Sequence, residues 1–142
     1  MFLGEFTHTI EEKGRLTIPA KFRADLDTGL IVTRGIDRCL AIYSMEEWRR
    51  LAEQVSALPV TDRRARAFRR LVFANASDSI PDKHGRVLTP PRLREYADLD
   101  SEAIVTGLNT YIEVWNPDFW GDEREHVEGD DANIEGWAAL GI

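Results

Sequence analysis

The chain has 142 residues, of which 43% are hydrophobic and 30% are charged, a balance typical of one ordinary globular domain or of two small fused ones. Its formal net charge of −7 at first argues against nucleic acid as a partner. No apolar run approaches the ~18 residues that a membrane span needs, and the first residues lack the basic region and apolar core of a secretory signal. The single cysteine, Cys39, cannot form an internal disulfide and is expected to fill the core. We therefore expect a cytoplasmic protein with no membrane partner.

The first half of the chain has the pattern of short strands separated by turns. Residues 2–10 alternate between apolar or aromatic and polar side chains, which indicates a strand. Gly14 can take a positive φ in the turn that follows, and Pro19 fits the first turn of a helix because it has no N–H to lose there. The expected elements are a strand over 2–10, a turn over 11–14, a strand over 15–18, a short helix over 19–26, and a hairpin with strands over 30–33 and 40–43.

Two helices are expected in the middle of the chain. Ser44 and Glu47 have the spacing of a capping box, and the helix that they open ends at Pro59. Its apolar face comprises Trp48, Leu51, Ala52, Val55 and Leu58. A second helix, from Thr61, has an apolar stripe of Ala65, Phe68, Leu71 and Val72 and is otherwise crowded with Arg63, Arg64, Arg66, Arg69 and Arg70. A basic helix face is most often simply solvated. Contact with DNA and contact with the acidic C-terminal stretch of a neighbouring subunit are equal alternatives for it.

The second half repeats the plan of the first. Asn116 and Pro117 are typical of a helix cap followed by the first helical position. The expected elements are a strand near 78–80, a turn over 82–85, a strand over 86–88, a short helix from 90, a hairpin with strands over 103–106 and 111–115, and a fraying helix from 116. Beyond Glu128 the Gly- and Asp-rich composition predicts poor order. The closing segment 137–140 is apolar enough to dock on this subunit or on a neighbour.

The acidic excess is confined to the C-terminal part. From Asp118 onward there are eight acidic residues and one arginine, so this stretch carries a charge of −7 and residues 1–117 are neutral. The overall charge therefore says little about the surface of the body, and nucleic acid remains a possible partner.

The two halves are copies of one unit. Residues 11–19 read EEKGRLTIP and residues 82–90 read DKHGRVLTP, an offset of 71. The sequence IVT occurs at both 31–33 and 104–106, an offset of 73. The predicted organisation is a first repeat over 1–60, a linker helix over 61–75, a second repeat over 76–125, and an acidic, flexible tail over 126–142.

Few features favour catalysis. The three histidines lack metal-ligand spacing, and no nucleotide-binding or hydrolase motif occurs. We expect no enzyme activity, no metal, no cofactor and no small-molecule substrate.

The repeated loops favour double-stranded DNA as the partner. Arg15 and Arg86 each follow a glycine turn and begin a strand, and arginine can pair bidentately with guanine in the major groove. Neighbouring basic side chains could contact phosphates. The predicted DNA-binding residues are Arg15, Arg86, Lys13, Lys83 and His84, and the predicted loop-forming residues are Glu11, Gly14, Asp82 and Gly85. Lys21, Arg23, Arg92 and Arg94 could widen the basic strip. The alternative is that each loop arginine only ties its turn to the core through the acid four residues before it.

The opening residues MFLGEF, the two acid-x-x-Gly-Arg loops and the duplicated body resemble the MraZ family of bacterial regulators, up to about residue 125. The resemblance implies an α+β, mainly β fold. In it, two tandem pseudo-repeats form an AbrB-like swapped-hairpin β-barrel with flanking helices. It explains why each half is too small to bury a core alone.

The resemblance further implies a sequence-specific transcriptional regulator that associates with the nucleoid. It would bind direct repeats in the promoter of its own division and cell-wall gene cluster, as a ring-shaped homo-oligomer. Glu11 departs from the aspartate usual in the family, so the two loops need not be equivalent. The alternatives are an antitoxin-type module of the same barrel class that binds a protein, and an assembly module that uses the ring alone.

Overall fold

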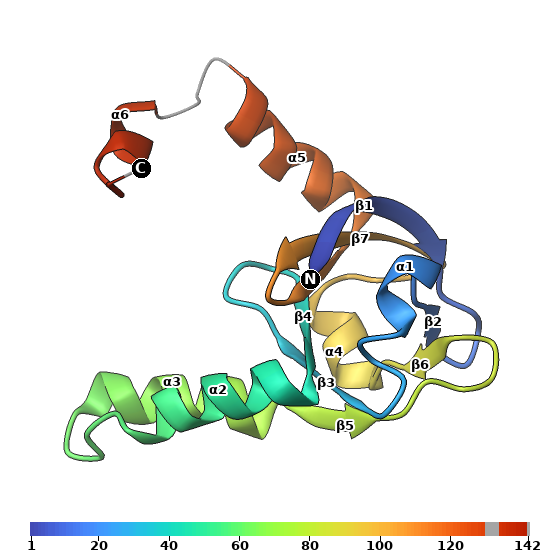
Figure 1. Ribbon diagram of the computed structural model, residues 1–142. Coiled ribbons are helices and arrows are strands. Elements are labelled where there is room, and N and C mark those ends of the chain that lie inside the picture. The colour runs from blue at the N-terminus through green and yellow to red at the C-terminus, as the bar shows by residue number, and fades with distance from the viewer. Residues whose placement is uncertain (130–133, 142) are drawn as a thin grey trace.

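The computed structural model describes residues 1–129 and 134–141 and has an α+β fold (Figure 1). Part of the segment predicted to be poorly ordered falls on residues 130–133, which lie outside the described residues. The strands are β1 (Phe2–Thr9), β2 (Arg15–Thr17), β3 (Leu30–Arg34), β4 (Leu40–Ser44), β5 (Ser77–Ser79), β6 (Arg86–Leu88), β7 (Glu102–Asn109) and β8 (Ile112–Trp115). The helices are α1 (Ala20–Arg23), α2 (Met45–Ser56), α3 (Arg63–Ala74), α4 (Pro91–Tyr96), α5 (Pro117–Glu128) and α6 (Ile134–Ala138).

The predicted strands and long helices are found within a few residues of their expected bounds, with two differences. The first short helix, expected over 19–26, is helical only over Ala20–Arg23 and continues as turns. A short helix, α6, lies in the tail that was predicted to be flexible.

The two halves exchange strands in an antiparallel six-stranded sheet of order β1-β7-β8-β4-β3-β5. Strand β1 of the first half pairs with β7 of the second, and β5 of the second half pairs with β3 of the first. The two hairpins meet where β4 pairs with β8. The remaining strands, β2 and β6, pair with each other across the halves.

The predicted swapped-hairpin barrel is not confirmed as a whole. The exchange of strands between the halves is present. In residues 1–129 and 134–141, however, the strands form one six-stranded sheet and one two-stranded sheet, with no closed barrel. Strands β1 and β5 are the two ends of the larger sheet and lie near the top and the bottom of the view in Figure 1.

The main hydrophobic core is built from both halves, as expected of halves that are small for single domains. Leu16 and Val87 enter it from the two short strands and are 0% and 1% exposed. Phe22 lies between Phe2 and Phe6 with edge-to-face geometry, and both centroid distances are 5.3 Å. The core therefore holds β2 and β6 against the sheet.

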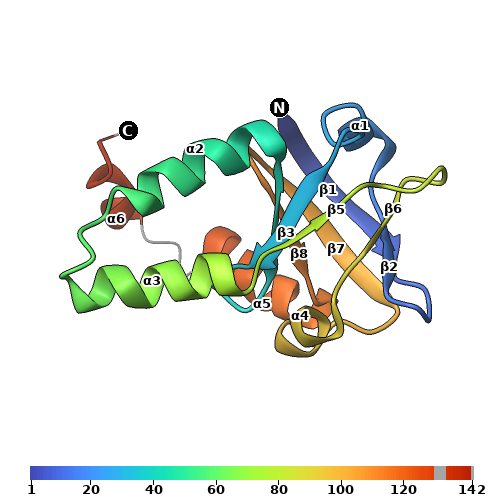
Figure 2. The same cartoon turned by 90° about the horizontal axis from the view of Figure 1, so that it is seen from below.

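Helices α2 and α3 form a hairpin that extends from the sheet (Figure 2). The predicted cap of α2 is present, since Ser44 Oγ accepts a hydrogen bond of 3.3 Å from the Glu47 N–H. Trp48 meets Phe73 edge to face at 5.8 Å between the two helices. Within the described part of the chain, no helix is long and apolar enough to cross a membrane.

Helix α5 starts at the predicted cap. Asn116 Oδ1 accepts hydrogen bonds from the N–H groups of Asp118 and Phe119, at 2.8 and 3.1 Å. Farther along, Arg124 forms an ion pair of 3.2 Å with Glu5 of β1. Helix α5 is thereby attached to the β1 end of the sheet.

Candidate nucleic-acid interface

The first loop is closed by its own backbone and by the Glu11 carboxylate. The Gly14 N–H donates to the Glu11 carbonyl at 2.8 Å, and the Glu11 N–H donates to the Arg15 carbonyl at 3.0 Å. Gly14 has a φ of +83°, which a residue with a Cβ rarely adopts. Glu11 Oε1 also accepts from the Lys13 N–H at 3.1 Å. These bonds fix the turn that leads into β2.

The second loop has the same hydrogen bonds, shifted by the repeat offset. The Gly85 N–H donates to the Asp82 carbonyl at 2.9 Å, and the Asp82 N–H donates to the Arg86 carbonyl at 2.9 Å. Gly85 has a φ of +72°. Asp82 Oδ1 accepts from the N–H groups of His84 and Arg86, both at 2.9 Å. The sequence repeat is therefore a structural repeat at the level of single hydrogen bonds.

Each loop arginine forms an ion pair with the acid of its own loop. Arg15 Nε donates to Glu11 Oε1 at 2.9 Å, and Arg86 Nε donates to Asp82 Oδ2 at 3.0 Å. The side-chain hydrogen bond from Arg15 lowers the pKa of the Glu11 carboxyl. The backbone hydrogen bond from Arg86 lowers the pKa of the Asp82 carboxyl. Both acids are therefore ionised at neutral pH and hold the guanidinium groups in place.

The two loops differ in how firmly they hold the arginine. Arg15 makes a second contact, from Nη2 to Glu11 Oε2 at 3.3 Å. Within the described part of the chain, the Asp82 carboxylate accepts one hydrogen bond from the Arg86 guanidinium, from its Nε. The longer Glu11 side chain reaches both sides of the guanidinium fork. The non-equivalence expected from the Glu11 substitution therefore has a geometric basis.

An arginine from the opposite half packs under each loop. Arg94 Nε donates to the Thr89 carbonyl at 3.1 Å. The N–H and the hydroxyl of Thr89 both donate to the Gly14 carbonyl, at 2.9 and 2.6 Å. In the matching position, Arg23 Nε donates to the Ile18 carbonyl at 2.9 Å. The Ile18 N–H donates to the Gly85 carbonyl at 2.8 Å.

The sequence did not predict this structural contact for Arg23 and Arg94, which it treated only as possible extensions of a basic strip. A signal was available, because each arginine follows its loop arginine by eight residues in both copies. The contact crosses between the halves, and spacing within one copy could not indicate that.

Strands β2 and β6 form a two-stranded antiparallel ribbon with one buried and one outer face. Side chains alternate between the faces of a strand, and Leu16 and Val87 take the buried face. Arg15 and Arg86 are on the other face and are partly exposed. The register is Leu16 with Val87, Arg15 with Leu88, and Thr17 with Arg86. The ribbon therefore carries one loop arginine on each strand of its outer face.

The other predicted basic residues lie at the loop tips. Lys13, Lys83 and His84 are exposed, in the turns at opposite ends of the ribbon. Lys21 and Arg92 are exposed on the short helices that follow the two strands. The structure thus brings the loop residues of both halves to one ribbon.

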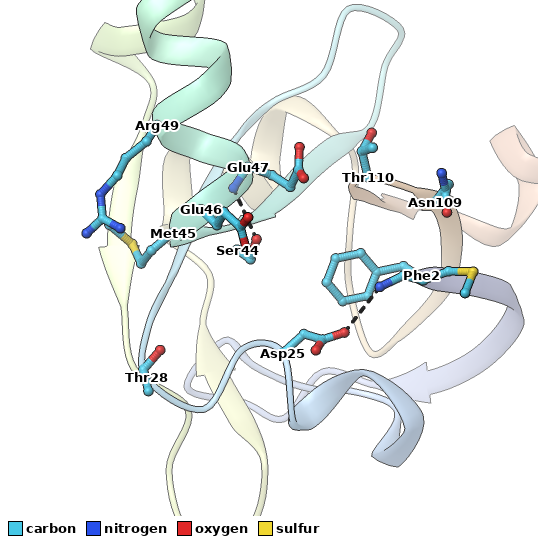
Figure 3. Close-up of a pocket in the computed structure, with 11 residues that line it drawn as sticks. Phe2, Asp25, Thr28, Ser44, Met45, Glu46, Glu47, Arg49, Asn109 and Thr110 are labelled. Carbon is cyan, nitrogen blue, oxygen red and sulfur yellow. Dashed lines mark hydrogen bonds and ion pairs between the residues drawn. The ribbon is translucent and has the colours of Figure 1, made fainter.

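A hollow of about 480 Å³ lies where the N-terminus meets α2, away from the ribbon (Figure 3). Its carboxylates already have cationic partners. Asp25 accepts from the Met1 amino group at 3.3 Å, and Glu46 and Glu47 both pair with Arg50. Across the described residues, no group of three His, Cys, Asp or Glu side chains could hold a metal ion. This hollow offers no recognisable catalytic arrangement.

Comparison with known proteins identifies one family. The family model described as "MraZ protein, putative antitoxin-like" matches residues 1–71 and again residues 72–133. A protein of Thermomicrobium roseum is 51% identical over 134 residues, which is 94% of each chain. A protein of Herpetosiphon aurantiacus is 54% identical over 120 residues, which is 84% of each chain. A protein of Salinispora arenicola is 44% identical over 95% of each chain. All three relatives are named transcriptional regulator MraZ. With two copies of the family model and identity of this extent over nearly its whole length, the chain belongs to the MraZ family.

Proposed function

We propose that this chain is a DNA-binding transcriptional regulator that binds short direct repeats in the promoter of its own division and cell-wall gene cluster. It acts on double-stranded DNA as a ring-shaped homo-oligomer, in the cytoplasm and at the nucleoid. The names of its relatives support regulation of transcription.

The observation that carries the proposal is the β2–β6 ribbon, with Arg15 and Arg86 on its outer face. The major groove of B-DNA admits a two-stranded ribbon, and an arginine in the groove can bond to O6 and N7 of guanine. A ribbon with approximate two-fold symmetry offers one arginine to each side of the groove. Lys13, Lys83 and His84 flank it and supply phosphate contacts.

The acid–arginine pairs are compatible with base readout. Arg86 uses Nε for Asp82, and no hydrogen bond joins its Nη nitrogens to another described residue. The terminal nitrogens, which extend farthest, are those that reach a base edge. The acid therefore orients the guanidinium and reduces the entropy that binding would cost. Arg15, held at two points by Glu11, is the more rigid of the two.

Oligomerisation explains how so few base contacts could suffice. Two arginine loops per subunit give modest affinity, and linking several subunits raises the effective concentration of each further loop at neighbouring repeats. Equivalent subunits in a ring present equivalent faces, which suits direct repeats in the DNA.

Fluorescence anisotropy tests the proposal, with the duplex upstream of the gene compared with a shuffled duplex of equal composition at two salt concentrations. We expect the native duplex to bind about a thousandfold more tightly, with affinity falling steeply as salt rises. Arg15→Ala and Arg86→Ala should each remove most of the preference, whereas Arg50→Ala, on exposed α2, should not. Equal affinity for the two duplexes would overturn the proposal.

The antitoxin-like description of the family favours a second candidate, a module that acts through protein contacts. In that case both duplexes would bind weakly and alike even at low salt, and the ribbon arginines would be dispensable for DNA affinity.

A further inference from the structure

Charge of opposite sign is concentrated on two helices at opposite ends of the sheet. Helix α3 contains five arginines and no acid. Helix α5 lies in the acidic C-terminal stretch and has Asp118, Asp122, Glu123, Glu125 and Glu128 against a single arginine. The two helices leave the sheet in different directions in Figure 1.

The exposed face of α3 carries a stripe of arginines. Arg63, Arg66 and Arg70 recur at i, i+3 and i+7, which places them on one side of the helix over about 10 Å. Arg63 and Arg70 are exposed, whereas Arg66 is partly exposed and donates a hydrogen bond of 2.9 Å to the Val60 carbonyl. The opposite side, with Ala65 and Val72, is buried. Among the described residues, no ion pair is formed by any arginine of this stripe.

Helix α5 carries the complementary stripe. Asp118, Asp122 and Glu125 recur at i, i+4 and i+7, and all three are exposed. In the described part of the chain, none of the three forms an ion pair. The two stripes therefore match in length and are opposite in charge.

The two stripes cannot meet within one subunit. Helix α5 is tied to β1 by the Arg124–Glu5 pair, whereas α3 packs on β3 and the Thr33 hydroxyl donates to the Val72 carbonyl at 2.9 Å. Three strands separate β1 from β3 in the sheet, a span of roughly 19 Å at the usual strand spacing. A second copy of the chain, however, can bring its α5 to the α3 of the first.

We propose that the acidic stripe of α5 in one copy docks on the arginine stripe of α3 in the next copy. Exposed apolar side chains lie near both stripes in the sequence, with Trp137 45% and Leu140 72% exposed after α5, and Val60 60% exposed in the turn before α3. A contact between two different surfaces is head-to-tail, and it closes into a ring when the rotation per subunit permits. The inference rests on the homo-oligomeric part of the proposed function and assigns its interface.

Charge reversal tests the interface, with mass measured by light scattering after gel filtration. One variant carries Arg63→Glu and Arg70→Glu, a second carries Asp122→Arg and Glu125→Arg, and a third combines all four changes. The control carries Asp27→Arg and Asp100→Arg, which change the net charge in the same direction and by the same amount as the second variant, at exposed sites elsewhere. Circular dichroism verifies that each variant keeps its helices.

We expect the native chain and the control to be oligomeric, each two-site variant to fall to the mass of a single chain, and the four-site variant to recover the native mass. Native mass in both two-site variants, or a native chain that is already a monomer, would overturn the inference. So would an α3 variant that keeps its mass but loses DNA affinity, since the stripe would then bind phosphates. The Arg86→Ala protein separates the two proposals, because it should lose DNA preference and keep its mass.

Discussion

The guanidinium of Arg94 lies against the backbone of Gly14, eighty residues earlier in the chain. A Cβ built on Gly14 would lie 2.5 Å from Cζ of Arg94. Arg23 has the same relation to Gly85 in the other loop. Each loop is therefore a composite, with the acid, the glycine and the loop arginine from one half and a bracing arginine from the other.

Gly85→Ala should lower the free energy of unfolding by about 1–3 kcal/mol. The new side chain would be strained at a φ of +72° and would displace Arg23. Gly121→Ala is the matched control, because Gly121 lies within α5 and a Cβ there would meet nothing within 4 Å. It should be neutral or stabilising by up to about 1 kcal/mol. Urea denaturation measures both, and equal effects would show that the loop conformation does not matter.

The composite loops predict coupling between halves in DNA binding. Arg94 braces the loop of Arg15 although it follows Arg86 in sequence. In double-mutant cycles on DNA affinity, Arg94→Ala should couple to Arg15→Ala by about 0.5–3 kcal/mol and to Arg86→Ala by less than about 0.5 kcal/mol. Arg94→Lys should restore little, because lysine lacks the planar fork. Equal coupling to both loop arginines would indicate general destabilisation instead.

Phe22→Ala should cost about 3–5 kcal/mol of stability, since Phe22 is 1% exposed and contacts two aromatic rings in the core. Lys21→Ala, at the exposed neighbouring position, should change stability by less than about 0.5 kcal/mol. Thermal and urea unfolding should agree. A small effect of Phe22→Ala would mean that the N-terminal strand does not share this core.

Stability should depend on pH through Glu113. Burial raises the pKa of its carboxyl, whose Oε1 accepts a hydrogen bond of 3.0 Å from Trp115 Nε1. A carboxyl with a raised folded-state pKa contributes stability that is complete below the unfolded pKa, near 4.5, and is lost as pH rises through the folded value. Glu113→Gln keeps the acceptor without the charge.

The Tm of Glu113→Gln relative to the native chain should therefore rise as pH increases from about 4.5 towards 7. Taking the difference between the two proteins cancels other titrating groups, such as His8, whose pKa is lowered by burial. Parallel Tm curves would show that Glu113 titrates normally.

The sequence alone determined the local features of this protein. The turn at Gly14 and its copy at Gly85, the cap at Asn116 and the apolar face of α2 depend on residues a few positions apart. Short motifs reveal the turns and the cap, and periodicity reveals the apolar face. The duplication was visible for the same reason, since it keeps glycine and charge positions in register. The role of Arg15 and Arg86 in DNA binding remains a prediction. Their pairing with the loop acids, offered as an alternative role, is present.

Only the tertiary structure decided which strand joins which hairpin and whether the sheet closes. The pairing of β1 with β7 joins residues about a hundred positions apart, and its register depends on how the whole core packs. The contact of Arg94 with Gly14 follows from that exchange of strands. So does the separation of α3 from α5 on opposite ends of the sheet. Periodicity describes one element at a time, whereas these relationships are set by hydrogen bonding and burial between elements distant in the chain.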